Sequence, residues 1–220
     1  MSVSLLNMSS EATGRSDRIV RLSHWTVAAL VALTVPIGFW MSNTYAAAQR
    51  DPGLQPRLHL LSAIHHTVGF TVLGLAGLWA AARAAGGRGA ATAQMQPWRA
   101  ALARTVHALL FMLLILLPLS GWSALSAFGD FPIYFGGYHL PGIVERVPFD
   151  DAHGYAFYAQ IHRWGWKAGA GLLALHSVAA VWHQCILKDG VLARMWFGAR
   201  SRRHAADMRN MNAVTGGRHD

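Results

Sequence analysis

The chain has 220 residues, a length that suits one domain, and its composition is unlike that of a soluble protein. Only 13% of the residues are charged, 53% are hydrophobic, and the charged residues avoid several long stretches of the chain. The net charge of +9 would suit a nucleic-acid-binding protein, but the basic residues lie between those stretches, which argues against nucleic acid as a partner.

Four stretches contain no Asp, Glu, Lys or Arg: residues 22–49, 58–82, 105–129 and 168–187. Each is at least as long as the roughly 20 residues that cross the core of a lipid bilayer. Lipid offers no partners to backbone polar groups, so such spans must be helical. The predicted fold class is therefore an all-α membrane protein, a bundle of four transmembrane helices. The alternative, a soluble protein with four buried helices, fits spans of this length poorly.

In chain order, the predicted elements are a disordered cytoplasmic tail over 1–17, helices over 18–42, 58–83, 98–128 and 159–188, and a basic cytoplasmic tail over 196–220. The helices are predicted to form one membrane domain over 18–195. The Gly- and Ala-rich segment 84–97 indicates a flexible inner loop. The connection 129–158 is too long for a simple turn, so we expect it to pack over the outer face.

The basic residues indicate how the chain lies in the membrane. If the spans alternate in direction, fourteen of the nineteen Lys and Arg residues fall on one side, and the other side receives five of them together with five carboxylates. Cytoplasmic loops of membrane proteins carry the excess of Lys and Arg. We therefore expect a multi-pass membrane protein with both termini in the cytoplasm.

Histidines are costly inside a membrane, so each one there is a candidate functional residue. Seven of the twelve histidines fall within or at the ends of the predicted spans: His24, His65, His66, His107, His162, His176 and His183. On the fourth helix, His162 and His176 are fourteen residues apart, which returns to nearly the same face with a rise of about 21 Å. Gly169 lies midway on that face, where a missing side chain leaves room for a flat macrocycle.

The predicted direction of each helix gives the depth of its histidines. The first helix enters from the cytoplasm and places His24 on the inner side, whereas the second enters from outside and places His65 on the outer side. The fourth also begins outside, so His162 should face His65 and His176 should face His24. Two imidazole pairs at two depths predict two haems, each ligated from both sides. Such iron is suited to electron transfer, because both axial positions are filled.

Other readings of these residues remain open. Single histidines often bond to carbonyl groups or cap interfaces, and zinc or copper is a weaker rival to haem. His66 faces away from His65 and is expected to be a satisfied polar residue, while His183 is the alternative to His176 as a ligand. Cys185 is the only cysteine, which excludes covalent attachment of a c-type haem and a cysteine-ligated iron–sulfur cluster.

Three further residues are candidates for cofactor binding. Arg21, one turn before His24, and Arg163, next to His162, could each pair with a haem propionate, because a guanidinium matches a carboxylate in shape and charge. Plain interfacial charge explains each arginine equally well. His107, near the inner end of the third helix, is expected to bond a propionate or a quinone, or else to anchor the interface.

These motifs together resemble the bacterial cytochrome b561 family, which includes the cytochrome b subunits of nickel–iron hydrogenases. The matching segments are Arg21 to Trp25, Ile64 to Gly69, His107 with Leu117 to Trp122, and His162 with Leu175 to Ser177 and Lys188 to Met195. The resemblance covers about 18–195. It implies four transmembrane helices, two non-covalent b haems, and ligands at His24, His65, His162 and His176, in agreement with the depth argument.

The resemblance also implies a function. Family members exchange electrons with ubiquinone or menaquinone; some resemble superoxide oxidases, and others dock with a dehydrogenase or hydrogenase. We therefore expect a dihaem cytochrome that passes electrons between a membrane quinone and a second redox partner, with a membrane-anchor subunit as the alternative. His66, Arg163 and the long outer connection depart from the family pattern, which leaves the outer partner open, and a homodimer remains open as the assembly.

Overall fold

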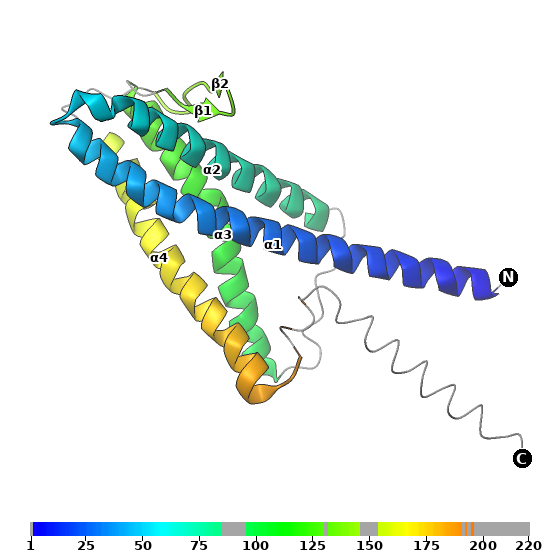
Figure 1. Cartoon of the computed structure of the whole chain (residues 1–220). Coiled ribbons are helices and arrows are strands. Elements are labelled where there is room, and N and C mark those ends of the chain that lie inside the picture. Colours follow the sequence, from blue (N-terminus) through cyan, green and yellow to red (C-terminus); the bar gives the residue numbers. More distant parts are fainter. Residues whose placement is uncertain are drawn as a thin grey trace, which may run out of the picture. The chain divides into compact units, whose positions relative to one another are not determined.

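The computed structural model describes residues 2–84, 96–129, 132–145, 154–190, 192 and 195, with side chains from residue 18 onwards. Its elements are the helices α1 (Ser2–Ala48), α2 (Gln55–Ala84), α3 (Pro97–Phe128) and α4 (Tyr155–Trp182), the short helices η1 (Pro52–Leu54) and η2 (His183–Leu187), and the strands β1 (Tyr134–Phe135) and β2 (Tyr138–His139) (Figure 1). Each of the four long helices belongs to a segment long and apolar enough to cross a membrane. The predicted all-α fold with four transmembrane helices is confirmed. Most of the predicted inner loop, 85–95, and the tail 196–220 lie outside the described residues.

The chain divides into two compact units. One unit combines Met1–His24 with Ala174–Asp220, and the other is Trp25–Leu173. The boundaries fall inside α1 and inside α4, so each of these two helices contributes to both units. The single membrane domain predicted over 18–195 stays a prediction.

Helix α1 is longer than the sequence predicted at both ends. It begins at Ser2 and ends at Ala48, whereas the prediction ran over 18–42 and left the preceding residues disordered. Residues 2–17 contain no proline, and extending an existing helix requires far less free energy than starting one. The apolar span therefore provides a helix that the preceding polar residues continue, and the segment expected to be disordered is the first part of α1.

Most of the buried residues on the helices of the unit Trp25–Leu173 are small. The buried alanines and serines of the helices in this unit are Ala48, Ala76, Ala100, Ala124, Ala127, Ser62, Ser120, Ser123 and Ser126. Large apolar side chains such as Leu33, Leu78 and Leu116 are exposed on the same helices. Helices surrounded by lipid pack in this way, because lipid solvates the large apolar groups and small residues allow close approach. The chain is therefore a multi-pass membrane protein.

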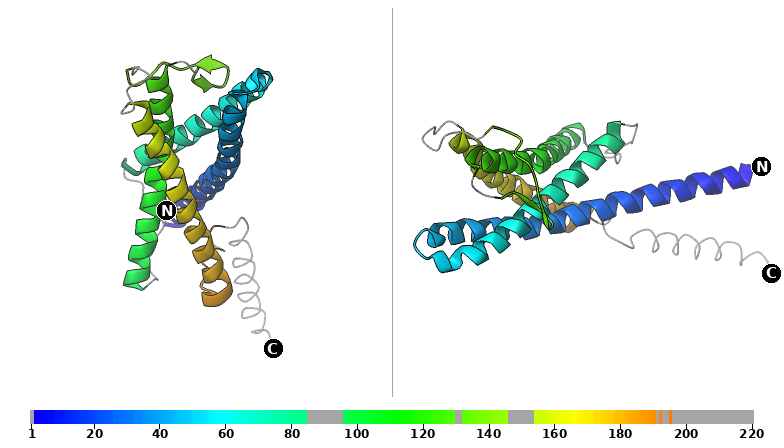
Figure 2. Two further views of the ribbon diagram at one scale, coloured as in Figure 1. Left: turned by 90° about the vertical axis from the view of Figure 1, so that its left-hand side faces the viewer. Right: turned by 90° about the horizontal axis from the view of Figure 1, so that it is seen from above.

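The connection after α3 forms a short hairpin that packs on α2. The backbone N–H of Gly136 donates a hydrogen bond to Thr67 Oγ1 at 3.0 Å, and the rings of Phe70 and Phe135 meet edge to face. Gly136 has φ +59°, a left-handed conformation that favours glycine in a tight turn. The hairpin lies at the same end of this unit as the α1–α2 connection (Figure 2). The described part of 129–158 thus covers one end of the helices, as expected; the membrane face to which that end belongs stays a prediction.

Candidate functional site

The structure brings His65 of α2 and His162 of α4 together in the unit Trp25–Leu173. Their ring centres are 6.2 Å apart, and the ring planes are inclined at 80°. This is the pair that the sequence predicted from helix direction and depth.

Each of these imidazoles is held through its Nδ1 atom by a third or fourth helix. His65 Nδ1 lies 3.2 Å from the carbonyl oxygen of Thr34 in α1 and 3.2 Å from the Thr34 hydroxyl. His162 Nδ1 lies 2.9 Å from the carbonyl oxygen of Leu117 in α3 and 3.3 Å from Ser120 Oγ. A carbonyl oxygen only accepts hydrogen bonds, so Nδ1 carries the proton in both rings. The lone pair that can bind a metal is then on Nε2.

Two glycines lie against these rings. A Cβ atom on Gly38 of α1 would be 2.8 Å from Cε1 of His65, and one on Gly121 of α3 would be 3.1 Å from Cε1 of His162. The first distance is below any ordinary contact, and the second is tight. The close approach of each imidazole to its neighbouring helix therefore depends on a residue without a side chain.

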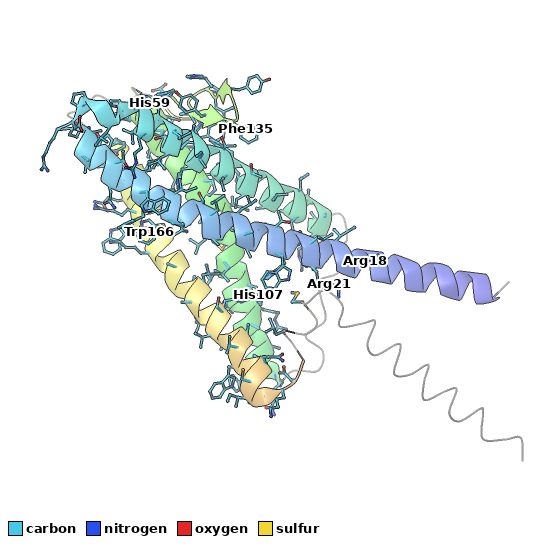
Figure 3. The ribbon with its side chains drawn as sticks, viewed as in Figure 1. Arg18, Arg21, His59, His107, Phe135 and Trp166 are labelled. Atoms are coloured by element: carbon cyan, nitrogen blue, oxygen red, sulfur yellow. The ribbon has the colours of Figure 1, made fainter. Side chains whose placement is uncertain are left out.

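The second predicted pair, His24 of α1 and His176 of α4, forms in the unit that combines Met1–His24 with Ala174–Asp220. Their ring centres are 6.3 Å apart, and the planes are inclined at 51°. Arg21 lies one turn before His24 on α1, and its Nε atom is buried without a hydrogen-bond partner among the described residues. Figure 3 labels Arg21 and Arg18 on the same helix. A buried guanidinium nitrogen of this kind is suited to an anionic group.

Both pairs have the spacing of two imidazoles on one metal. An imidazole nitrogen binds a metal at about 2.0 Å and lies about 1.1 Å from the centre of its ring, so two opposed ligands have ring centres about 6.2 Å apart. The observed spacings are 6.2 and 6.3 Å. Among the described residues, no three His, Cys, Asp or Glu side chains converge. A zinc site needs at least three protein ligands, whereas a haem iron needs only two axial ones.

A family model described as prokaryotic cytochrome b561 matches residues 15–198, a range that contains both histidine pairs and all four spans. The chain belongs to the prokaryotic cytochrome b561 family. It is therefore a transmembrane b-type cytochrome of electron transfer, and haem b is the cofactor that its family implies. The opposed imidazoles fit haem b, which takes neutral nitrogen ligands without a covalent link to the protein. No curated protein matches the chain.

The other two candidate cofactor residues of this b561-family cytochrome lie on helix surfaces. His107 is exposed on α3, with Nδ1 at 2.6 Å from the carbonyl oxygen of Ala103 in the preceding turn (Figure 3). Arg163 is exposed on α4 and donates a hydrogen bond to Gln160 Oε1 at 2.9 Å. Their predicted contacts with a haem propionate or a quinone stay predictions.

His66 and His183 belong to neither histidine pair in the structure. His66 is half-buried next to His65, and its Nδ1 has no partner among the residues described, so the expectation of a satisfied polar residue is not met at that atom. His183 begins the π-helical turn η2 and pairs through Nδ1 with the carboxylate of Asp189. The ring near His24 is that of His176, which favours His176 over His183 in the ligand position.

The sequence analysis did not identify the two backbone carbonyls that hold the imidazoles, those of Thr34 and Leu117. In α1 the carbonyl of Thr34 precedes Gly38 by four residues, and in α3 the carbonyl of Leu117 precedes Gly121 by four, with Pro36 and Pro118 between them. A proline followed within a turn by a glycine, inside a transmembrane helix, was the available signal. Only the second of these turns entered the sequence analysis, within the family motif Leu117 to Trp122. The glycine expected to matter, Gly169, instead has Leu113 and Leu117 of α3 as neighbours.

Proposed function

We propose that this cytochrome carries two haems b and passes electrons between a membrane quinone and a second redox partner. His65 and His162 would ligate one iron, and His24 and His176 the other. The observation that carries the proposal is that the two histidine pairs expected from helix direction form between different helices, with ring centres 6.2 and 6.3 Å apart, a spacing that suits one metal between each pair.

The surroundings of the His65–His162 pair support a metal role for Nε2. A histidine that ligates a metal nearly always donates its other ring N–H to a carboxylate, carbonyl or water, which fixes the tautomer and raises the basicity of the ligand. Both rings have a backbone carbonyl in that place. When bound by His65 and His162, haem would supply one-electron redox chemistry, and the two imidazoles would leave no ligand site on its iron for oxygen or substrate.

The distribution of Lys and Arg along the chain supports an orientation in the membrane with both termini in the cytoplasm. The excess of Lys and Arg in the terminal segments and in the α2–α3 connection favours cytoplasmic termini in a bacterial inner membrane. Ubiquinone or menaquinone would exchange electrons from within the membrane. The second partner would act at the opposite face, where superoxide is a candidate. Arg50, Arg57 and Lys167 are exposed in the unit Trp25–Leu173 and would attract an anion, while the exposed carboxylates Asp51 and Glu145 oppose that attraction.

Haem counted per chain tests the ligand assignment. The full chain, expressed with ample haem precursor and purified in mild detergent, should contain two haems b by the pyridine haemochrome assay. His65→Ala or His162→Ala should remove one haem, and His24→Ala or His176→Ala the other. His139→Ala, in the exposed hairpin, is the control and should keep both. A colourless wild-type protein, or ligand variants with full haem content, would overturn the proposal.

The redox partners need separate assays on the purified protein. Reduction of the haems on mixing with a soluble quinol analogue would support the quinone, and reduction on mixing with superoxide would support the superoxide:quinone oxidoreductase form. Failure of the haems to exchange electrons with any quinone would contradict the proposed function.

A membrane-anchor subunit that docks a dehydrogenase or hydrogenase is the second candidate function. The hairpin favours it, because Tyr138 is 79% exposed and Phe135 is 42% exposed at one end of the unit Trp25–Leu173. Aromatic residues are enriched at protein interfaces. Co-purification with a dehydrogenase or hydrogenase in mild detergent would support this candidate, and its loss on Tyr138→Ser would locate the interface. A stable monomer or homodimer purified alone would count against it.

A further inference from the structure

We propose that Gly38 and Gly121 are positioning residues that let each imidazole of the His65–His162 pair dock on a backbone carbonyl of the neighbouring helix. The inference rests on the proposed role of these two histidines as haem ligands. It assigns the orientation of both rings, and the electron density they donate to iron, to two glycines that contact no metal themselves.

Helix geometry explains why glycine is needed at these positions. The side chain of a helical residue points towards the N-terminus and covers the turn before its own Cα. In an α-helix the carbonyl of residue i accepts a hydrogen bond from the N–H of residue i+4. The side chain of residue i+4 therefore lies over the carbonyl to which its own N–H is bonded. Gly38 stands in this relation to Thr34. Without a side chain there, the second lone pair of the Thr34 carbonyl is open to His65 Nδ1.

Helix α3 repeats the arrangement for the second ligand. Gly121 follows Leu117 by four residues, and the Leu117 carbonyl accepts from His162 Nδ1 at 2.9 Å. A Cβ on Gly121 would lie 3.1 Å from Cε1 and 3.2 Å from Nδ1 of His162. The two helices share no sequence repeat, yet each has a carbonyl, a proline and a glycine in one turn beside an imidazole. Two independent occurrences in one pair indicate a requirement of the site.

Other glycines in the described spans behave differently. A Cβ on Gly69, Gly74, Gly77 or Gly171 would meet nothing within 4 Å, and one on Gly165 would meet the end of the flexible Leu117 side chain. Gly38 and Gly121 differ in that their neighbour is a ring whose other nitrogen is proposed to be held by iron.

An added methyl group would therefore change the ligand and not only the packing. With Nε2 held by iron, the ring of His65 can avoid a Cβ on residue 38 only by rotating or tilting. Either movement lengthens the hydrogen bond from Nδ1 to the Thr34 carbonyl. A weaker hydrogen bond lowers the basicity of the imidazole. A less basic ligand stabilises ferric iron less, so the midpoint potential of this haem should rise.

The experiment uses the full-length dihaem protein with Gly38→Ala and Gly121→Ala, and with Gly74→Ala and Gly171→Ala as matched controls in open surroundings. Haem per chain is counted first, and each variant is then followed by redox titration and by low-temperature EPR of the ferric haems. His65→Ala identifies the signals that belong to the His65–His162 haem.

We expect Gly38→Ala to raise the midpoint potential of the His65–His162 haem and to shift its EPR signal, because its overlap is the larger one. Gly121→Ala should give a smaller change in the same direction. The other haem and both control variants should match the wild type. If Gly38→Ala does not accumulate, Gly121→Ala carries the test alone: a raised midpoint potential would support the inference, and wild-type values would overturn it.

Wild-type potentials and EPR signals in Gly38→Ala and Gly121→Ala would overturn this inference while leaving the two haems in place. Loss of the proposed function would look different: the wild-type chain would lack two haems, or His65→Ala and His162→Ala would keep both. The two failures are therefore distinguishable in one series of preparations.

Discussion

At the scale of single residues, Arg21 lies one turn before His24 on α1, and its Nε atom is buried without a partner among the described residues. A buried N–H donor without a partner is costly, which favours a hydrogen-bond acceptor beside it in the functional protein. A haem propionate has the required charge and the bidentate shape.

Arg21→Gln should lower the midpoint potential of the His24–His176 haem. A positive charge near the haem favours the reduced iron, because ferrous haem carries one positive charge fewer, so removing that charge favours the oxidised form. The measurement is a redox titration of the purified protein with both haems resolved. Arg18→Gln is the matched control, because Arg18 is exposed on the same helix (Figure 3). Equal shifts in both variants would indicate a general charge effect and contradict a specific contact.

At the scale of elements, the sequence predicted the middle of each helix and the bounds of α3 well, and the starts of the other three helices less well. The middle depends on apolar length, which the absence of charged residues reveals directly. The ends depend on local backbone preferences: α1 starts at Ser2, α2 at Gln55 and α4 at Tyr155, all within polar or mixed segments. Polarity alone does not stop a helix that already exists.

The histidine pairs were predictable for a related reason. Helical period and alternating direction together determine the depth and face of each side chain. The contacts that hold His65 and His162 were only partly predictable. A proline and a glycine in one turn mark the helical turn concerned, but no spacing within one helix shows which imidazole that turn faces, because this depends on the rotation of α1 and α3 about their axes.

The turn of the hairpin could have been predicted from two adjacent glycines in the sequence. Gly136 and Gly137 stand between the aromatic pairs of β1 and β2, and two glycines between strand-forming residues are a common hairpin turn. The length of the connection 129–158 predicted that it packs over one end of the helices, but it did not predict the strands β1 and β2.

Trp122→Phe should loosen this hairpin without affecting the haems. Trp122 Nε1 donates a hydrogen bond to the carbonyl oxygen of Pro141 at 3.0 Å, and its ring also contacts Phe70. Phenylalanine keeps a ring and removes the donor, which should cost about 1 kcal/mol locally. Hydrogen exchange followed by mass spectrometry should show faster exchange in 132–145 with two haems retained. Trp98→Phe, at an exposed position of α3, should leave that exchange unchanged; a change in both variants would point to global destabilisation.

At the scale of the whole molecule, each of the four helices contributes a ligand or a supporting carbonyl to the proposed haem sites. Helix α4 contributes a ligand to each pair, His162 and His176, and α2 contributes His65. Helix α1 contributes His24 and also the carbonyl that holds His65. Helix α3 contributes no predicted ligand, but its Leu117 carbonyl holds His162. Each helix is thus needed for at least one proposed haem, so a bundle of fewer helices would lose a ligand or its support.

The side of the membrane on which each proposed haem lies depends on which end of the molecule faces the cytoplasm, and the single cysteine tests this. Cys185 is exposed in η2, at the end of α4. If the termini are cytoplasmic, a membrane-impermeant maleimide should label Cys185 in inverted membrane vesicles and not in intact spheroplasts.

A variant with the reporter at the other end completes the topology test. Tyr138→Cys in a Cys185→Ser background places the only thiol in the exposed hairpin, which lies at the opposite end of α4 from residue 185 in chain order. The labelling should then reverse, with reaction in spheroplasts and none in sealed inverted vesicles. Labelling of Cys185 from outside the cell would invert the orientation and place the charge excess on the external face. The two thiols reacting from the same side would contradict an odd number of crossings between them, and with it the assignment of α4 as a complete span.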